Sequence, residues 1–213
     1  NLDAGSFAIF QAVREAVGSE FDMMIETHAM LNFEVAVKMA ERLAPLGVTW
    51  YEEPAGPENS DTLRAFRERL PSNAPICVGE RHYTRHGFRP VLEKHICDVI
   101  MPDITRCGGP SEMKRIATMG EAYGVMVAPH NPNGPLSTLA SAHVCASIPN
   151  FFRCEFMVND VPWRDEVITH PLDVREGFLH LSDRPGLGVD LIEEELEKHP
   201  GIRGLKEKDN FYV

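Results

Sequence analysis

One stretch of this sequence reads Val48-Thr49-Trp50-Tyr51-Glu52-Glu53-Pro54. It is an apolar run that ends in two adjacent carboxylates. The proline that follows cannot continue a hydrogen-bonded ladder and keeps the preceding residue extended. Successive side chains of a strand face opposite sides, so Glu52 and Glu53 point in different directions. A carboxylate fixed at the end of a buried strand indicates a metal ligand or an acid–base group.

A helix followed by an apolar strand recurs along the chain. We predict helices over residues 6–17, 33–46, 61–70, 86–95, 111–123 and 136–148, and strands at residues 21–26, 48–54, 74–80, 96–103, 125–130 and 151–155. Strands that alternate with helices form a parallel sheet with right-handed crossovers. The sequence therefore predicts an α/β fold built from six consecutive strand and helix units.

Each predicted strand ends in one residue that can do chemistry: Glu26, Glu52, Glu80, Asp103, His130 and Glu155. In an open doubly wound sheet, functional residues gather at a single switch point. In a (β/α)₈ barrel, every strand end converges on one site, so six such ends in succession favour the barrel. Such a barrel has eight strands, and we expect the first two to lie upstream of Asn1.

The pattern changes after Glu155. We assign residues 1–156 to the barrel and residues 157–213, which are rich in Pro and Asp, to a tail that covers one edge of the barrel. Within the tail, residues 177–181 are typical of a short strand, and residues 190–199 of a solvated acidic helix end.

The composition argues against several classes of protein. The formal net charge of −11 disfavours a nucleic-acid partner, because the phosphate backbone would be repelled. No apolar run reaches bilayer-spanning length. The five cysteines are odd in number and lack C-x-x-C spacing, so we expect reduced core residues of a cytoplasmic protein rather than zinc ligands. A Rossmann-type dehydrogenase is disfavoured because the G-x-G-x-x-G motif is missing.

Three of the strand-end residues suggest a metal site. Glu26, Glu52 and Glu80 come from successive strands, which places them side by side on the rim of a barrel. Carboxylates gathered without a cation repel one another, whereas oxygen ligands suit a hard divalent ion such as Mg²⁺, with Mn²⁺ as a substitute. Any one of these residues alone could simply pair with a surface Lys or Arg, but three in register favour the metal.

Asp103 and His130 are next along the rim. An aspartate that accepts a hydrogen bond from one imidazole nitrogen fixes the tautomer and makes the other nitrogen more basic. His28 lies two residues past Glu26 and faces the same side if the strand continues, opposite His130. A base on one face and an acid on the other is what a β-elimination needs. We expect the remaining histidines to be ordinary core or surface groups: His82, His86, His95, His143, His170, His180 and His199.

Taken in order, these motifs resemble the enolase superfamily, in particular the acid-sugar dehydratases of its mandelate racemase subgroup. The resemblance covers nearly the whole chain and is carried by Glu26-Thr27-His28, Trp50-Tyr51-Glu52-Glu53-Pro54, Val78-Gly79-Glu80-Arg81, Met101-Pro102-Asp103 with Gly108-Gly109, Ala128-Pro129-His130, Glu155 and Arg184-Pro185-Gly186-Leu187-Gly188. The fold that it implies is a TIM-type barrel whose first strands and N-terminal capping domain lie outside this chain. The tail would pack on both barrel and capping domain.

The resemblance also implies roles. Glu26, which replaces the Asp that is usual there, would bind Mg²⁺ with Glu52 and Glu80, and the cation would hold the substrate carboxylate. His130, paired with Asp103, would remove the proton alpha to that carboxylate. Glu155 would hydrogen-bond the carboxylate from the other side, which requires that Glu155 be protonated or share its proton. His28 would protonate the departing 3-hydroxyl group.

The activity so implied is the dehydration of a small-molecule sugar acid, an aldonate or aldarate, to a 2-keto-3-deoxy acid by a hydro-lyase. We expect a cytoplasmic homo-oligomer that binds neither nucleic acid nor membrane. One alternative on the same scaffold is an epimerase, racemase or cycloisomerase, which forms the same enediolate without losing a group at C3. The other is a non-catalytic sugar-acid-binding relative.

Overall fold

The computed structural model describes residues 4–70, 75–158 and 160–200, and its elements follow the predicted alternation. The helices of the barrel part are α1 (Ala4–Val17), α2 (Phe33–Leu43) with the short 3₁₀ helix η1 (Ala44–Leu46), α3 (Ser60–Arg69), α4 (Thr84–Glu93), α5 (Gly109–Ala122) and α6 (Pro135–Cys145). The strands of this part are β1 (Met23–Glu26), β2 (Val48–Glu52), β3 (Ile76–Val78), β4 (Val99–Ile100) and β5 (Met126–Val127).

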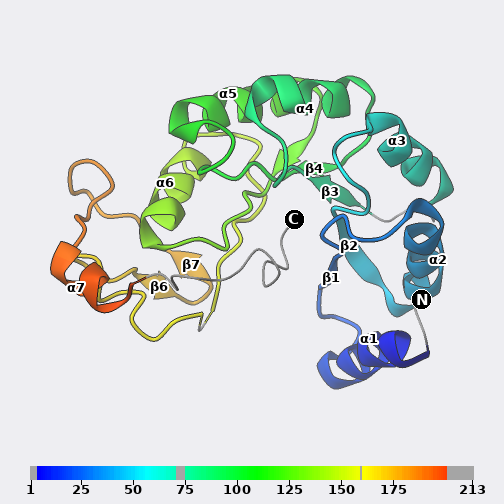
Figure 1. The fold of residues 1–213 in the computed structure, drawn as a ribbon, viewed down its shortest axis with the longest axis horizontal. Coiled ribbons are helices and arrows are strands. Elements are labelled where there is room, and N and C mark those ends of the chain that lie inside the picture. Colours follow the sequence, from blue (N-terminus) through cyan, green and yellow to red (C-terminus); the bar gives the residue numbers. More distant parts are fainter. Residues whose placement is uncertain (1–3, 71–74, 159, 201–213) are drawn as a thin grey trace.

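The five strands form one parallel sheet in the order β1-β2-β3-β4-β5. Neighbours in the sequence are neighbours in the sheet, as in the wall of a barrel. The sheet curves into an arc, and α2 to α6 lie on its outer side (Figure 1). Because all strands run the same way, their carboxyl ends meet on one side. The predicted barrel-type α/β fold is confirmed for the part of the chain that the structure describes.

Helix α2 illustrates how the sequence builds this layer. Its N-cap residue Asn32 accepts a hydrogen bond from the backbone N–H of Val35 at 3.0 Å, which satisfies a donor that the helix leaves free. Val37, Ala40 and the other apolar residues on one face are buried against the sheet, while Glu34 and Lys38 stay on the outer face. Apolar residues spaced three and four positions apart thus form one face of the helix, and this face packs on the sheet to build the core.

The prediction of a sixth strand at residues 151–155 is wrong in extent, because the pairing in the structure is much shorter. The segment runs beside β5, with Val127 N donating to Asn150 O at 2.8 Å and Phe152 N donating to Val127 O at 2.9 Å. However, only a single parallel bridge, between Val127 and Phe151, forms there. Pro129 explains the interruption, because it has no N–H to donate where the ladder would continue.

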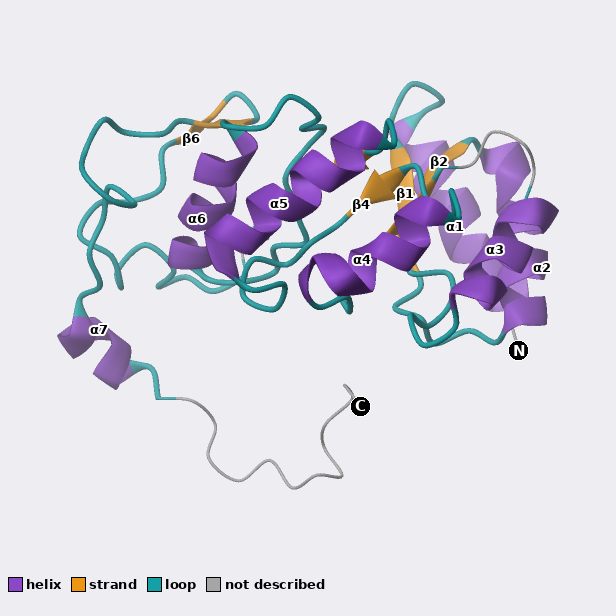
Figure 2. Ribbon diagram, turned by 90° about the horizontal axis from the view of Figure 1, so that it is seen from above, coloured by secondary structure: helices purple, strands orange, loops and turns teal. Residues whose placement is uncertain are grey.

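The tail begins with turns and then forms a two-stranded antiparallel sheet of β6 (Val174–Arg175) and β7 (Phe178–Leu179). The exposed helix α7 (Glu193–Lys198) follows and lies at the far end of the molecule from α1 to α3 (Figure 2). The short strand and the acidic helix expected in the tail are therefore confirmed. The division at residue 156 and the packing on a capping domain stay predictions, and residues 201–213 lie outside the described residues.

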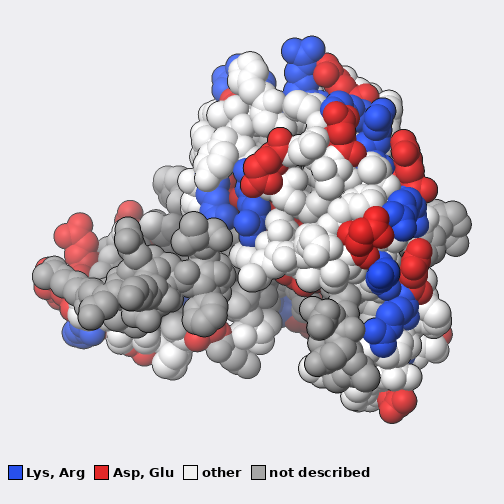
Figure 3. Space-filling model, turned by 45° about the vertical axis from the view of Figure 1, so that its right-hand side comes forward, with Lys and Arg blue, Asp and Glu red and all other residues white. Residues whose placement is uncertain are grey.

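Four of the five cysteines are core residues, as expected. All five are free thiols, and every one except the half-buried Cys154 is buried. None of the described helices combines the length and the apolarity needed to cross a membrane. Acidic and basic side chains alternate over the outer helices (Figure 3), where ion pairs such as Lys94 with Asp61 and Arg69 with Glu34 join neighbouring elements. Exposed pairs of this kind contribute little to stability.

Candidate active site

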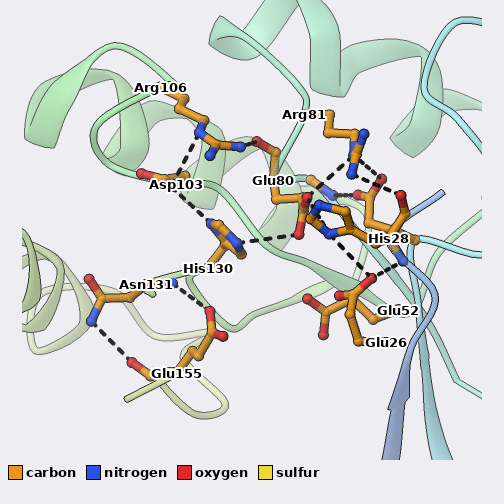
Figure 4. A network of polar contacts seen from close by, with 12 residues as sticks. Glu26, His28, Glu52, Glu80, Arg81, Asp103, Arg106, His130, Asn131 and Glu155 are labelled. Carbon is orange, nitrogen blue, oxygen red and sulfur yellow. Dashed lines mark hydrogen bonds and ion pairs between the residues drawn. The ribbon is translucent and has the colours of Figure 1, made fainter. Parts of the chain in front are cut away.

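Asp103 and His130 form a buried pair beyond the ends of β4 and β5. The Nδ1 atom of His130 lies 2.9 Å from Oδ2 of Asp103, and both side chains are removed from solvent. The other ring nitrogen, Nε2, lies 3.3 Å from Oε2 of Glu80 (Figure 4). Since Asp103 takes up Nδ1, Nε2 is the atom that faces the remaining acidic groups. The structure thus brings together the aspartate and histidine that the sequence pairs.

The surroundings of this pair favour the ionised carboxylate of Asp103 and the protonated imidazole of His130. Burial raises the pKa of Asp103, but hydrogen bonds from His130, Thr105 and Asn133 outweigh it and hold the pKa well below its ordinary range. For His130, burial lowers the pKa, and the hydrogen bond to Asp103 with the charges of Glu80 and Glu155 raises it above its ordinary value. An imidazole so placed can take up a proton at Nε2 and hold it.

Glu80 lies at the centre of the site, two residues past the end of β3. The intervening Gly79 has φ 150°, and a side chain there would meet the backbone of Met101 at 2.7 Å. Glycine is therefore needed to aim Glu80 inward. Glu80 is 2% exposed, and its Oε1 makes no hydrogen bond among the described residues, although Nε of Arg81 lies 3.3 Å and Nδ1 of His28 3.4 Å away. A buried carboxylate oxygen in this state suits a cation.

His28 reaches the site by a route that the sequence did not indicate. The extended conformation stops at Glu26, and both His28 and Ala29 have left-handed backbone angles, with φ 53° and 54°. The expectation of a continuing strand is wrong at this point. The backbone N–H of His28 instead donates to the side chain of Glu26, and its carbonyl accepts from Nη2 of Arg81 at 2.8 Å. This turn brings the imidazole to Glu80, on the other side from His130 (Figure 4).

Glu26 and Glu52 are paired in register at the ends of β1 and β2. Burial, followed by the hydrogen bond with Glu26 and its charge, raises the pKa of Glu52 to about 10, although a hydrogen bond from Trp50 opposes the shift. That donor, Nε1 of Trp50, lies 2.9 Å from Oε2 of Glu52. Two carboxyl groups that hydrogen-bond to each other share a proton in the absence of a cation. A divalent ion would offset the repulsion between the two carboxylates and allow both to ionise.

A group of donors that could hold a metal ion is present among the described residues. It consists of Glu26, His28 and Glu80, whose ligand atoms lie within 4.8 Å of one another. Glu52 adjoins this group through Glu26 but is not part of it. The residues present fit a hard divalent cation, since the donors are mostly carboxylate oxygens and one of them is buried without a hydrogen bond.

Sequence reasoning missed two residues, Glu53 and Arg81, that support the site. They lie beside the acidic cluster, the name used here for Glu26, Glu52 and Glu80. Glu53 is 1% exposed, and its Oε1 accepts the backbone N–H of Gly79 at 2.7 Å. Arg81 stands between carboxylates, with Nε 3.3 Å from Oε1 of Glu80 and 3.9 Å from Oε2 of Glu53. The sequence did contain a signal for Glu53. Adjacent residues of a strand face opposite sides, so if Glu52 faces the site, Glu53 points away from it and needs a different polar partner.

Glu155 lies on the far side of His130 from Glu80. Its Oε2 accepts the backbone N–H of Asn131 at 2.6 Å, and its backbone carbonyl accepts from the amide of the same residue at 3.1 Å. Asn131 is fully buried, so this contact fixes the glutamate at the rim of the site. Glu155 is therefore near the other strand-end residues, as expected, and its proposed contact with substrate stays a prediction.

Three of the remaining histidines pack against aromatic rings. His82 is buried against Phe88, with ring centroids 5.3 Å apart, and His199 stacks on Trp163 at 4.2 Å. His95 packs edge-on against Tyr123 at 5.9 Å. These contacts agree with the expectation of ordinary core and surface groups.

Comparison with known proteins agrees with this barrel-type α/β fold. Residues 4–195 match the family model described as enolase C-terminal domain-like. The chain is 34% identical to D-xylonate dehydratase of Haloferax volcanii, over 90% of this chain and 46% of that protein. It is 31% identical to D-galactarolactone cycloisomerase of Agrobacterium fabrum, over 88% of this chain and 51% of that protein.

A solved structure supports the fold as well. The mandelate racemase/muconate lactonizing enzyme-like protein from Rubrobacter xylanophilus superimposes with a TM-score of 0.85 at 39% identity, over 92% of this chain and 50% of that protein. The chain therefore spans about half the length of the proteins it matches. With most of its length covered by the family model and its site residues at the ends of a parallel barrel wall, this chain belongs to the enolase C-terminal domain-like family of the enolase superfamily.

Proposed function

We propose that the protein carrying this chain is an acid-sugar dehydratase, a hydro-lyase that converts an aldonate or aldarate to a 2-keto-3-deoxy acid. The observation that carries the proposal is the orientation of His130, whose Nδ1 is held 2.9 Å from Asp103 while Nε2 faces the acidic cluster. Similarity to proteins named D-xylonate dehydratase and arabinonate dehydratase supports the substrate class.

In this proposal, Glu26, Glu52 and Glu80 hold Mg²⁺, or Mn²⁺ in its place. When bound, the cation supplies the positive charge that stabilises negative charge developing on the substrate carboxylate. Without a cation, these carboxylates and the net charge of −11 would repel an anionic acid, and a bound divalent ion would offset that repulsion locally. Glu155 hydrogen-bonds the substrate carboxylate from the side opposite the cation, through a proton that the two groups share.

The proton steps belong to the two histidines. His130 Nε2 takes the proton from C2, and the electrons of the broken C–H bond enter the enediolate. Those electrons then form the C2–C3 double bond while the C3–O bond breaks, and His28 gives its proton to the departing oxygen, releasing water. The enol tautomerises to the 2-keto acid. The positions of the imidazoles on opposite sides of Glu80 support this division of roles.

The natural protein that carries this chain, purified with Mg²⁺, tests the proposal when incubated with a panel of aldonic and aldaric acids. Formation of a 2-keto-3-deoxy acid from at least one of them is expected. If no member of the panel yields such a product, the proposal is wrong.

The similarity to a protein named D-galactarolactone cycloisomerase supports a second candidate, an isomerase of a sugar acid. Such an enzyme forms the same enediolate but loses no group from C3. Incubation in D₂O separates the two, because deuterium that enters C2 of recovered substrate without formation of a keto acid favours the isomerase.

A further inference from the structure

Asn133 connects the Asp103–His130 pair to the tail of the chain. Its Nδ2 donates to Oδ2 of Asp103 at 3.1 Å, the same oxygen that faces Nδ1 of His130. The other oxygen, Oδ1, accepts the backbone N–H of Thr105 at 2.8 Å and its hydroxyl at 2.6 Å. Two donors on each oxygen leave the carboxylate little freedom to rotate. The orientation of His130 therefore depends on the residues that place these donors.

Asn133 itself lies on the loop between β5 and α6, and a tail residue holds this loop. The guanidinium Nη2 of Arg164 donates to the backbone carbonyl of Asn133 at 3.0 Å, across 31 positions of sequence. Arg164 is buried, and its guanidinium lies over the ring of Phe156 at 5.3 Å. Asp160 completes the arrangement, because its carboxylate accepts from Nε of Arg164 at 2.9 Å and from Nη2 at 2.5 Å.

We propose that Arg164, oriented by Asp160, is a positioning residue for the proton transfer at His130, and that it acts through Asn133 and Asp103. This inference rests on the proposed function, since it concerns the same pair. The competing explanation is that Arg164 only anchors the tail. Under that explanation, its loss lowers stability and leaves the chemistry of the folded protein unchanged.

The geometry requires an arginine. Its planar fork donates to Asp160 along one edge and to the carbonyl of Asn133 from the same Nη2 nitrogen, which a lysine ammonium cannot reproduce while it stays buried. A displacement of the Asn133 loop shifts Asp103 and turns the imidazole, and misplacement of about 1 Å can cost roughly 100-fold in rate. The effect of losing Arg164 should therefore appear in kcat rather than in KM.

The test uses the natural full-length protein with Mg²⁺ and four variants: Asn133→Ala, Arg164→Lys, Arg164→Met and the double variant Asn133→Ala/Arg164→Met. Arg175→Gln is the matched control, because Arg175 is an exposed tail arginine paired with Asp173. We expect kcat to fall by about 10- to 100-fold in the first three variants, with KM nearly unchanged. The control should keep the wild-type kcat.

The double variant separates positioning from anchoring. If Arg164 acts through Asn133, the double variant loses no more kcat than Asn133→Ala alone, because coupled residues are not additive. Independent effects that multiply, or wild-type kcat in folded Asn133→Ala and Arg164→Lys, overturn the inference. These two milder variants decide the matter if Arg164→Met does not fold.

A spectroscopic measurement keeps the inference distinct from the proposed function. The proton on Nδ1 of His130 gives a downfield NMR signal, assigned by its loss in His130→Asn. That signal should shift or broaden in Asn133→Ala and Arg164→Lys and stay unchanged in Arg175→Gln. A shifted signal in a protein inactive on every acid supports the positioning and refutes the proposed function, whereas an unmoved signal overturns the positioning.

Discussion

His130 presents its Nδ1 atom 2.9 Å from Oδ2 of Asp103 at the carboxyl ends of two adjacent strands. The hydrogen bond to Asp103 and the neighbouring acidic charges raise the pKa of His130, against the opposing effect of burial. A general base must be neutral before it accepts a proton, so activity should rise as the pH increases through this raised pKa. In the proposed mechanism, the contact with Asp103 thus controls both the direction of the ring and the pH range in which His130 acts as a base.

Asp103→Asn tests this relationship. The amide cannot carry the charge that raises the pKa of His130, so the rising limb of the plot of kcat/KM against pH should move to lower pH. At the same time kcat should fall about 100- to 10,000-fold, the usual contribution of general acid–base catalysis. Steady-state rates between pH 5 and pH 9 measure both effects. An unchanged rising limb would show that His130 is not the titrating base.

His28→Gln should divide the reaction into its two halves. In the proposed mechanism, proton abstraction at C2 by His130 does not require His28, whereas departure of the 3-hydroxyl group does. The variant should therefore still exchange the C2 proton for deuterium from D₂O, while dehydration falls about 100-fold or more. NMR of recovered substrate and assay of the keto acid measure the two rates. Equal loss of exchange and dehydration would contradict the role of His28 as the acid.

Glu52 and His28 compete as the third ligand of the proposed metal site. The resemblance assigns Glu26, Glu52 and Glu80, whereas the donors within reach of one another are Glu26, His28 and Glu80. Glu52→Gln should weaken Mg²⁺ binding by tenfold or more and His28→Gln much less, because Mg²⁺ prefers oxygen ligands. Isothermal titration calorimetry measures both affinities. The reverse order would make His28 the ligand.

The calorimetric titration with Mg²⁺ should also detect the release of a proton from Glu52. Without a cation, burial and Glu26 raise the pKa of Glu52 to about 10, so at pH 7 this carboxyl group is protonated. Binding of a divalent ion favours the carboxylate and should release about one proton. Titrations in buffers of different ionisation enthalpy measure the number of protons released. No release at pH 7 would mean that Glu52 stays outside the coordination shell.

Much of the site was predictable because strand ends are local features of the sequence. Glu26, Glu52, Asp103 and His130 each follow an apolar run, and parallel strands bring such ends to one side of a sheet. The Asp103–His130 contact needed only this rule and the chemistry of the two residue types.

What escaped prediction depends on backbone turns and on partners distant in the sequence. No pattern marks the left-handed turn at His28, because the imidazole reaches Glu80 only through non-glycine residues with positive φ. Arg164 and Asn133 come from different segments, separated by 31 positions, so their contact exists only in three dimensions. Pro129 was visible, yet its effect on the sixth strand required knowing which N–H the ladder needed.

Gly79→Ala should destabilise the protein. Its φ of 150° is rare for side-chain-bearing residues, and the new methyl group would lie 2.7 to 2.9 Å from backbone atoms of Met101, which cannot move aside. Overpacking of this kind costs about 1–3 kcal/mol before the backbone strain is added. Gly134→Ala is the control, because nothing lies within 4 Å of the added methyl group. Urea unfolding compares the two, and equal stability would contradict the crowding.

His82 should make the protein acid-sensitive below neutral pH. Burial lowers its pKa from 6.5 to about 4, partly offset by the charge of Glu58, so the folded state holds the ring neutral. The unfolded state binds the proton more readily between these two values, and stability is lost as the pH falls from about 6.5 to about 4. The shift corresponds to roughly 3 kcal/mol at most.

His82→Phe removes this titration while keeping a ring beside Phe88. Between pH 7 and pH 4.5, the variant should lose less free energy of unfolding than the wild type, because it lacks the imidazole that the unfolded state protonates more readily. The difference between the two proteins isolates this contribution from that of all other acid-titrating groups. Urea unfolding at both pH values gives the four free energies required. If wild type and variant lose the same amount, His82 binds its proton equally well in the folded and unfolded states, and its burial does not limit acid stability.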